Sequence, residues 1–311
     1  MTDPVDELRP ISELGLQEAV DRLEELGEHE SAELVRRALE RQQASRGIFG
    51  GTAILTNVLG RKAWAHAAHT LGFIHPASPG SESSTITHAG NIASAAQLRD
   101  KRLRLSLYAL RVAQYPGRGT HRVLLHFSCQ NQRQTDAEQL HFNATYRVAD
   151  GDHAGVIGQP IFDGVRTGED GLAFRCVTIN VKNDEDERLI SFLDGDAFKR
   201  GLQLVDAVQP ALAPFVEMAR GLARGLASRS RNVPVQDVQL GLDFGRAAGG
   251  ARLAIGSYVA VQIPERQYVG WDWSNWVFDH NAGRIVLASD RNTLIPYNYL
   301  CFGVEPCRER A

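Results

Sequence analysis

The sequence lacks the short motifs that mark several large enzyme classes. It contains no GxxxxGK[ST], GxGxxG, GxSxG or HExxH segment. These absences exclude a P-loop, a dinucleotide-binding turn, a nucleophile elbow of the α/β-hydrolase type and a zincin helix. The signatures of protein kinases and zinc deaminases are missing as well. An enzyme whose active site is assembled from distant parts of the chain stays compatible with the sequence.

Paired cysteines, excess positive charge and long apolar runs are also missing. None of the four cysteines belongs to a CxxC pair, which predicts free thiols in a reducing, cytoplasmic environment. The formal net charge of -3 gives no global basic field, so nucleic acid is not an expected partner. No apolar run approaches the roughly 18 residues that predict a transmembrane helix. The acidic N-terminus is not expected to be a signal peptide.

The first part of the chain has the spacing of two amphipathic helices. Apolar residues recur at helical spacing from Leu16 to Leu26, and Gly27 is a natural end to the pattern. A second pattern begins near Ser31, so these segments predict a helical hairpin. The outer surface of the hairpin is acidic. The residues that we single out there as candidates for contact with a protein partner are Glu24, Glu25 and Glu28.

The next segment is harder to assign. Residues 61–71 have the composition of a third helix, on which His66 and His69 would share a face. Serine, proline and glycine then become frequent, which predicts a linker or long loop over 75–100.

After Arg102 the pattern changes from helical spacing to alternation. The clearest strand covers 140–148, where alternation predicts a core face with Phe142 and Tyr146 and a solvent face with His141 and Asn143. Further strands are predicted over 103–110, 123–129, 172–181, 236–244, 253–263, 284–288 and 297–304.

These patterns predict an α+β protein with antiparallel sheets. Regular helical crossovers are missing, which argues against a Rossmann or TIM organisation. We expect an α-helical module at 1–74, a linker at 75–100 and an antiparallel β-sandwich at 101–308. Helical spacing over about 197–228 predicts an insertion within the sandwich, and Arg220 and Arg224 lie on the far face of that insertion.

Acidic residues cluster in the predicted loops of the sandwich. C2 domains bind calcium through carboxylates on such loops, so the pattern loosely resembles a C2 domain. This resemblance implies calcium as a cofactor, with Asp184, Asp186, Asp194 and Asp196 as candidate ligands. The alternative interpretation is that these are solvated turn residues and that Asp194 or Asp196 caps a helix that starts near Ala197.

Three of the four tryptophans, Trp271, Trp273 and Trp276, fall in one segment. Exposed tryptophans contact carbohydrates, membrane interfaces or protein partners. The alternative interpretation is a small core beneath a long loop.

Three functional hypotheses follow. The first is a non-catalytic interaction protein of the cytosol, in which the helical module docks a protein partner and the β-sandwich presents a binding surface. The second is a calcium- or membrane-dependent effector that uses the acidic loops and the tryptophan segment for peripheral contact. The third is a hydrolase with scattered Asp and His residues. We rank them in that order, so an enzyme is not the favoured interpretation.

Overall fold

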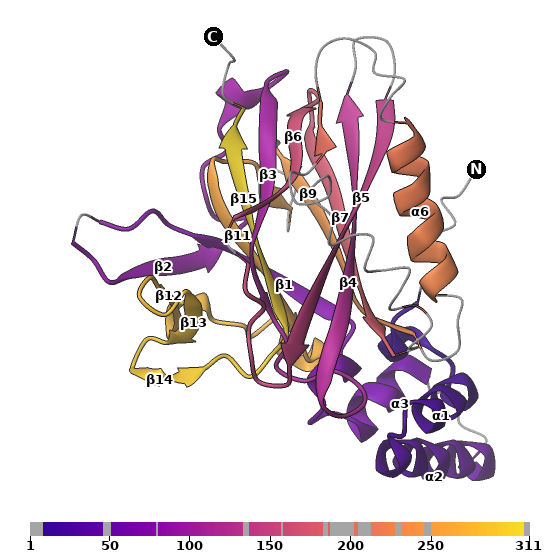
Figure 1. The fold of residues 1–311 in the computed structure, drawn as a ribbon. Helices are drawn as coiled ribbons and strands as arrows, with labels where there is room; N and C mark the ends of the chain where they lie inside the picture. Colours follow the sequence, from indigo (N-terminus) through magenta and orange to yellow (C-terminus); the bar gives the residue numbers. More distant parts are fainter. Residues whose placement is uncertain are drawn as a thin grey trace.

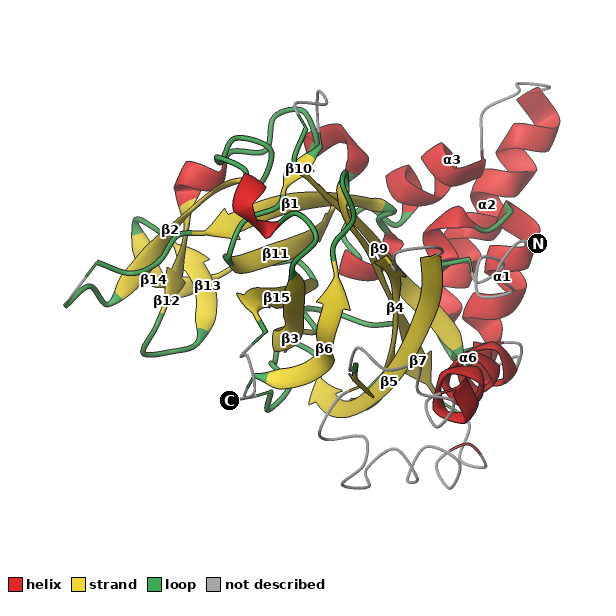
Figure 2. Ribbon diagram, turned by 90° about the horizontal axis from the view of Figure 1, so that it is seen from above, coloured by secondary structure: helices red, strands yellow, loops and turns green. Residues whose placement is uncertain are grey.

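The protein is described here by a computed structural model. It describes residues 9–45, 51–78, 80–132, 137–156, 158–182, 186, 202–204, 213–227, 232–245 and 250–307. The fold is α+β, with a short helical region near the N-terminus and a mostly β part made of two sheets (Figures 1 and 2). No described helix is both long enough and apolar enough to cross a membrane.

The N-terminal helices confirm the predicted hairpin. Helix α1 (Leu16–Glu25) and helix α2 (His29–Ser45) are joined at Gly27, whose φ of 74° is accessible to glycine without a steric penalty. Helix α3 (Gly51–Val58) follows, and two 3-10 turns, η2 (Ile11–Glu13) and η3 (Ala63–Ala65), flank these helices in sequence. The apolar stripe of α1, including Leu23, is buried in the main hydrophobic cluster.

Residues 61–71 do not form the predicted helix. After η3 the chain enters strand β1 (Ala68–Ile74), which pairs along its whole length with β11 (Gly256–Ile263). Strand β2 (Ser83–His88) pairs with β1 and lies inside the predicted linker. The hydrogen-bond partner of β1 is far away in sequence, and local spacing cannot show such pairing. The predicted boundary at residues 100 and 101 therefore falls between β2 and β3, which belong to the same sheet.

Both strands belong to a ten-stranded sheet with the order β14-β13-β12-β2-β1-β11-β15-β3-β6-β8. Strands β2, β12, β13 and β14 form a lobe that projects to the left in Figure 1. The remaining members are β3 (Arg102–Arg111), β6 (Gln159–Arg166), β8 (Leu202–Gln203), β12 (Trp276–Asp279), β13 (Arg284–Leu287), β14 (Asp290–Leu294) and β15 (Tyr299–Pro306).

The second sheet has five strands in the order β10-β9-β7-β4-β5. Its members are β4 (Thr120–Gln132), β5 (Ala137–Ala149), β7 (Gly171–Val181), β9 (Val233–Asp243) and β10 (Ala251–Arg252). Helix α6 (Ala213–Ala227) packs on β5 and β4 (Figures 1 and 2). It lies within the predicted helical insertion, whereas Leu202–Gln203 forms β8 beside β6 instead of a helix.

Aromatic side chains fill the space between the two sheets. Phe127 and Phe174 of the five-stranded sheet contact Phe302 of the ten-stranded sheet, with ring centroids 6.5 and 5.0 Å away. Phe142 is buried as predicted, and Tyr146 is partly buried against the same cluster. One face of the five-stranded sheet therefore belongs to the core, which leaves the polar residues of the alternating pattern on the other face.

Candidate functional site

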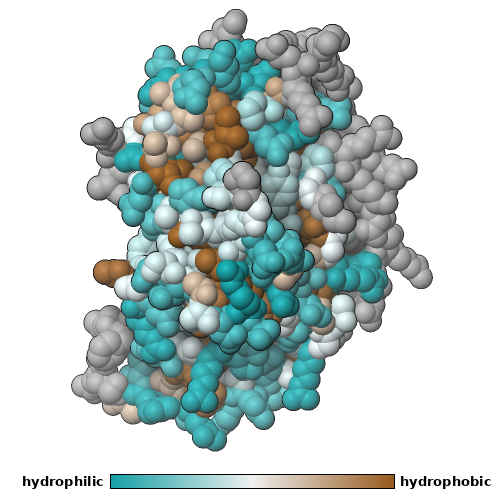
Figure 3. Space-filling model, turned by 90° about the vertical axis from the view of Figure 1, so that its left-hand side faces the viewer, coloured by the Kyte–Doolittle hydropathy of each residue, from teal (hydrophilic) through white to brown (hydrophobic). Residues whose placement is uncertain are grey.

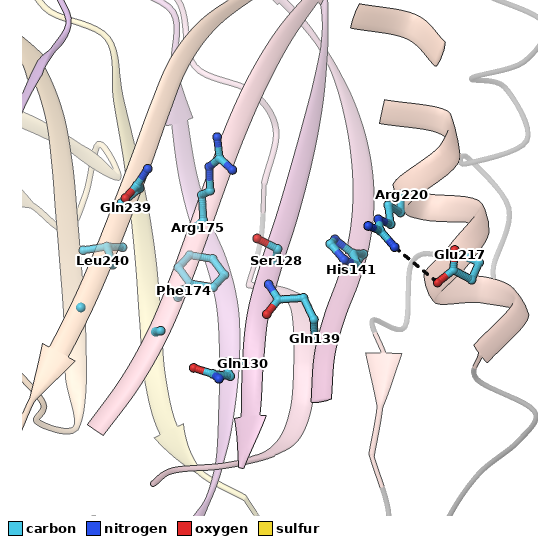
Figure 4. Close-up of a pocket in the computed structure, with 12 residues that line it drawn as sticks. Ser128, Gln130, Gln139, His141, Phe174, Arg175, Glu217, Arg220, Gln239 and Leu240 are labelled. Carbon is cyan, nitrogen blue, oxygen red and sulfur yellow. Dashed lines mark ion pairs between the residues drawn. The ribbon is translucent and has the colours of Figure 1, made fainter. Parts of the chain in front are cut away.

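A groove of about 720 Å³ lies on that outer, polar face of the five-stranded sheet (Figure 4). Four strands form its floor, and α6 forms one wall. The side chains that give it its polar character are Ser128 and Gln130 from β4, Gln139 and His141 from β5, Arg175 from β7, Gln239 from β9, and Glu217 and Arg220 from α6.

Strand register aligns four of these residues in a row across the floor. His141 is paired with Ser128, Ser128 with Arg175, and Arg175 with Gln239. Neighbouring strands are about 4.8 Å apart, so the row is about 14 Å long. Every residue of this row presents a group that can form hydrogen bonds.

Small residues keep the β7–β9 part of the floor open. Ala173 is paired with Gly241, and both line the groove. A Cβ atom placed on Gly241 would come near only one other atom, Oδ1 of Asp243 at 3.9 Å. Position 241 therefore has room for a side chain that projects into the groove.

The arginine in the floor is held by an ion pair. Arg175 donates through Nε to Oδ1 of Asp237 at 2.8 Å and through Nη2 to Oδ2 at 2.7 Å. Both side chains are largely buried, and the two-point geometry fixes the guanidinium plane. Glu13 of η2 lies close by, and burial followed by the Asp237 carboxylate raises the pKa of Glu13. The guanidinium of Arg175 at the β9 end of the groove is therefore already engaged by a carboxylate.

The His141 end of the groove is built differently. His141 and His126 stack with ring centroids 5.3 Å apart, and Nδ1 of His141 lies 3.3 Å from Nε2 of His126. His126 is linked through Nδ1 to Oδ1 of Asn143 at 2.8 Å, and Nδ2 of Asn143 donates to the main-chain oxygen of Ala219 at 2.8 Å. The chain of hydrogen bonds therefore connects the groove to α6.

This chain corrects the predicted exposure of β5. His141 and Asn143 are only 3% and 0% exposed, although the alternating pattern placed them on the solvent face. Helix α6 covers that face, and alternation within one strand carries no information about a helix that packs over it.

Replacement of Asn143 with alanine is expected to lower the free energy of unfolding by about 2 kcal/mol, because it leaves the buried His126 Nδ1 and the Ala219 carbonyl without this partner. Arg147→Ala, on the exposed part of the same strand, should change it by less than about 0.5 kcal/mol. Urea unfolding of both variants measures the difference. Equal losses would show that the amide network contributes no stability.

The candidate tryptophans lie in the lobe rather than in the groove. Trp271 stacks on Trp276 at a centroid distance of 6.1 Å and meets the edge of Trp273 at 5.5 Å. Trp273 is 4% exposed and belongs to a separate hydrophobic cluster with Ile285 and Tyr299. The face seen in Figure 3 is mostly hydrophilic, with a larger group of hydrophobic residues near the top and smaller ones scattered below it. Partner contact through these tryptophans stays a prediction.

The candidate acidic residues of the hairpin are engaged within the chain to different degrees. Glu28 accepts hydrogen bonds from the Gly117 amide and the Ser31 hydroxyl, both at 3.0 Å, and pairs with Lys62 at 3.5 Å. Glu24 pairs with Arg36, and Glu25 lies 3.8 Å from Arg22. Glu24 and Glu25 are exposed and stay candidates for contact with a protein partner.

Of the four calcium ligands predicted from the acidic loops, Asp186 belongs to the described residues. Asp184, Asp194 and Asp196 lie outside the described residues. Asp186 is buried and accepts a hydrogen bond from Nδ2 of Asn232 at 2.6 Å. Within the described part of the chain, no group of three or more His, Cys, Asp or Glu side chains is arranged to hold a metal ion.

Two partly buried histidines have strongly lowered pKa values. The Nε2 atom of His69 in β1 is buried. The Asp237 carboxylate acts to raise the pKa of this histidine, but burial has the larger effect. Burial lowers the pKa of His69 from 6.5 to about 4. Burial, followed by the positive charges of Arg111 and Arg284, lowers the pKa of His153 to about 4 as well.

These two histidines predict a loss of stability in acid. Between pH 6.5 and 4 the unfolded chain binds more protons than the folded chain, so the free energy of unfolding falls as pH falls. The full shift at His69 corresponds to about 3 kcal/mol. Urea unfolding at pH 7 and pH 4.5 should show a smaller loss for His69→Gln than for the wild type. His29→Gln, at an exposed position, should match the wild type.

No known family model, curated protein or solved structure matches this chain. Function is therefore inferred from the residues of the groove. The sequence analysis does not predict the groove, because its residues are the polar halves of four alternating patterns. Only the register of β5, β4, β7 and β9 brings them into one row.

Proposed function

We propose that this chain is a non-catalytic recognition protein that binds a polar ligand in the groove of the five-stranded sheet. The observation that carries the proposal is the row His141, Ser128, Arg175 and Gln239, which lines an open groove of about 720 Å³ beside α6 (Figure 4). Pockets of this size are typical of small-ligand sites. Three exposed glutamines, Gln130, Gln139 and Gln239, add groups that both donate and accept hydrogen bonds.

The hydrogen-bond chain behind His141 favours binding over hydrolysis. In a hydrolytic triad, a carboxylate orients the catalytic histidine and stabilises its protonated form. Among the described residues, the hydrogen bonds behind His141 run through His126 to the amide of Asn143, and Asp237 is paired with Arg175 three strands away. Substrate turnover at this groove is therefore not part of the proposal.

We also propose that the two sheets form a β-sandwich that presents the groove on its outer face, and that the exposed acidic surface of α1 docks a protein partner. The packing of Phe127 and Phe174 on Phe302, across the space between the two sheets, supports the β-sandwich.

The C2-like alternative requires calcium binding by the acidic loops. Under the recognition proposal, millimolar calcium leaves the Tm unchanged. A rise in Tm that Asp194→Asn removes would favour the calcium-dependent effector instead.

Gly241→Trp is the variant that tests the groove. The indole would fill the open β7–β9 part of the floor, where a Cβ meets no close atom. We would measure the Tm of the wild type and this variant with neutral and acidic oligosaccharides, short peptides and mononucleotides. At least one compound should stabilise the wild type, by about 2.7 kcal/mol at a hundredfold excess over Kd, and should leave Gly241→Trp unchanged.

Gly155→Trp is the matched control, because Gly155 is exposed, has no atom within 4 Å of its Cβ position and does not line the groove. This variant should respond to ligand like the wild type. Compounds that stabilise Gly241→Trp as much as the wild type would contradict the location of the site.

A further inference from the structure

Two arginines of the ten-stranded sheet, Arg111 and Arg284, lie around one buried tyrosine, outside the groove. Strand register pairs Arg111 of β3 with Tyr299 of β15, and directly paired residues share a face of the sheet. The Tyr299 hydroxyl accepts a hydrogen bond from the main-chain nitrogen of Ile285 at 3.2 Å, and Arg284 precedes Ile285 in β13. His153, which an isolated bridge pairs with Arg111, lies 2.8 Å from the same hydroxyl through Nε2. Residues from three strands and one turn therefore meet at this point.

The positive charges of the two arginines are close enough to affect each other. Burial has the largest effect on the pKa of Arg111, which it lowers, and the charge of Arg284 acts in the same direction. After burial, both charges also contribute to the low pKa of His153, so this histidine is neutral near pH 7. The two guanidinium groups therefore repel each other across a site that contains no other positive charge from these residues.

The hydrogen bonds of the two arginines do not neutralise their charges. Arg111 is 5% exposed, and it donates through Nε to the main-chain oxygen of Ile295 at 3.0 Å and through Nη1 to that of Gly151 at 2.6 Å. The Nε atom of Arg284 is buried and has no acceptor among the described residues. A buried charge is unfavourable unless an opposite charge lies beside it. An anion bound between the two guanidinium groups would therefore lower the free energy of this part of the fold.

The carboxylate of Asp152 is near this place but is exposed. Its charge acts on Arg111 and His153, yet within the described chain it forms no ion pair with Arg111 or Arg284. Two guanidinium groups and one solvated carboxylate leave positive charge in excess. Nη2 of Arg111 and both terminal nitrogens of Arg284 form no hydrogen bond with described residues, and solvent reaches them. These are the groups that can bind an anion from solution.

We infer that Arg111 and Arg284 bind a tetrahedral oxyanion of the phosphate type where β3, β13 and the turn at 150–153 meet. A doubly charged anion with at least three oxygens can accept hydrogen bonds from both guanidinium groups at once, whereas a carboxylate has two oxygens and one charge. Strand β13 belongs to the lobe in Figure 1, so the bound anion links the lobe to β3. The site lies on the ten-stranded sheet and does not depend on the proposed function of the groove.

Titration calorimetry with inorganic phosphate, glycerol 3-phosphate and acetate, at constant ionic strength, tests this site. The wild type should bind both phosphates at least about tenfold more tightly than acetate. Arg284→Gln should weaken phosphate binding about tenfold or more, because it removes a charged donor. Its Tm without phosphate should not fall, because the substitution also removes repulsion from Arg111. Arg41→Gln, on the exposed part of α2, should bind phosphate like the wild type.

The two phosphates identify the source of the anion. Equal affinities would assign the site to free phosphate, and tighter binding of glycerol 3-phosphate would assign it to a phosphate ester. Either result supports the site. Equal binding of acetate and phosphate, unchanged phosphate binding in Arg284→Gln, or no heat of binding from either phosphate at millimolar concentration would overturn it. Loss of phosphate binding in Gly241→Trp would place the anion in the groove and would also overturn it.

Asp152→Asn distinguishes an anion site from a purely structural role of the two arginines. Removal of this exposed negative charge should tighten phosphate binding severalfold, because the carboxylate repels the anion. A fall in Tm that phosphate does not reverse, with no gain in affinity, would show that Asp152 itself neutralises Arg111 and would overturn the inference.

Discussion

A chain that starts at residue 97 is expected to aggregate rather than fold. It lacks β1 and β2, and β1 pairs with β11 from Ala68 opposite Ile263 to Ile74 opposite Ser257. Loss of β1 leaves a long edge of unpaired main-chain groups on β11, which is a template for association. It also separates β12, β13 and β14 from the rest of the ten-stranded sheet, because β2 and β1 are their only link in the strand order of the described residues.

The truncation also removes part of the core. Leu23, Leu55 and Trp64 are fully buried and belong to the same cluster as residues of both sheets. A chain that starts at residue 9 keeps every described element and serves as the control. It should be soluble and melt cooperatively. A soluble 97–311 chain with a cooperative melt would instead support the separate module that the sequence predicts.

Gly171→Ala is expected to destabilise the protein by about 3 kcal/mol or more. Gly171 has a φ of 139°, a conformation that L-residues with a Cβ rarely adopt. An added Cβ would lie 2.0 Å from the main-chain oxygen of Leu242, and that oxygen belongs to β9, which pairs with β7. Main-chain atoms of a paired strand can move only if hydrogen bonds of the sheet are distorted. The free-energy cost of the unfavourable φ angle and the cost of the steric overlap therefore add.

Gly241→Ala is the matched control because it concerns the same pair of strands. Its Cβ would lie no closer than 3.9 Å to another residue. Urea unfolding should show a change below about 1 kcal/mol for Gly241→Ala. Similar losses in both variants would mean that glycine is required along these strands for a reason other than the close approach at Gly171.

The sequence predicted those elements whose local pattern matches their surroundings. Helix α1 has one buried stripe and one solvent face, and β5 has one face in the core, so periodicity places Leu23 and Phe142 correctly. Strand β1 has weak alternation and many alanines and histidines nearby, so local spacing predicts a helix over 61–71. The segment is a strand because it pairs with β11 and β2, and the local sequence pattern does not reveal such pairing.

The candidate site was predictable only in part. Alternation predicts that His141 and Asn143 share one face of β5, but α6 packs over that face and both side chains are buried. Arg220 was visible as a residue on the polar face of a helix. Its position beside β5 depends on how α6 packs, and the row across the floor depends on register between strands that are distant in sequence.

The central claim is that a ligand binds on the polar floor of the five-stranded sheet, and nuclear magnetic resonance of the glutamine side-chain amides tests it most directly. On titration with the compound that gives the wild type its largest rise in Tm, the amide signals of Gln130, Gln139 and Gln239 should shift together. The signal of Gln17, which bonds to Asp21 on exposed α1, should not move. Shifts confined to residues outside the groove, with these three amides unchanged at saturation, would contradict the account.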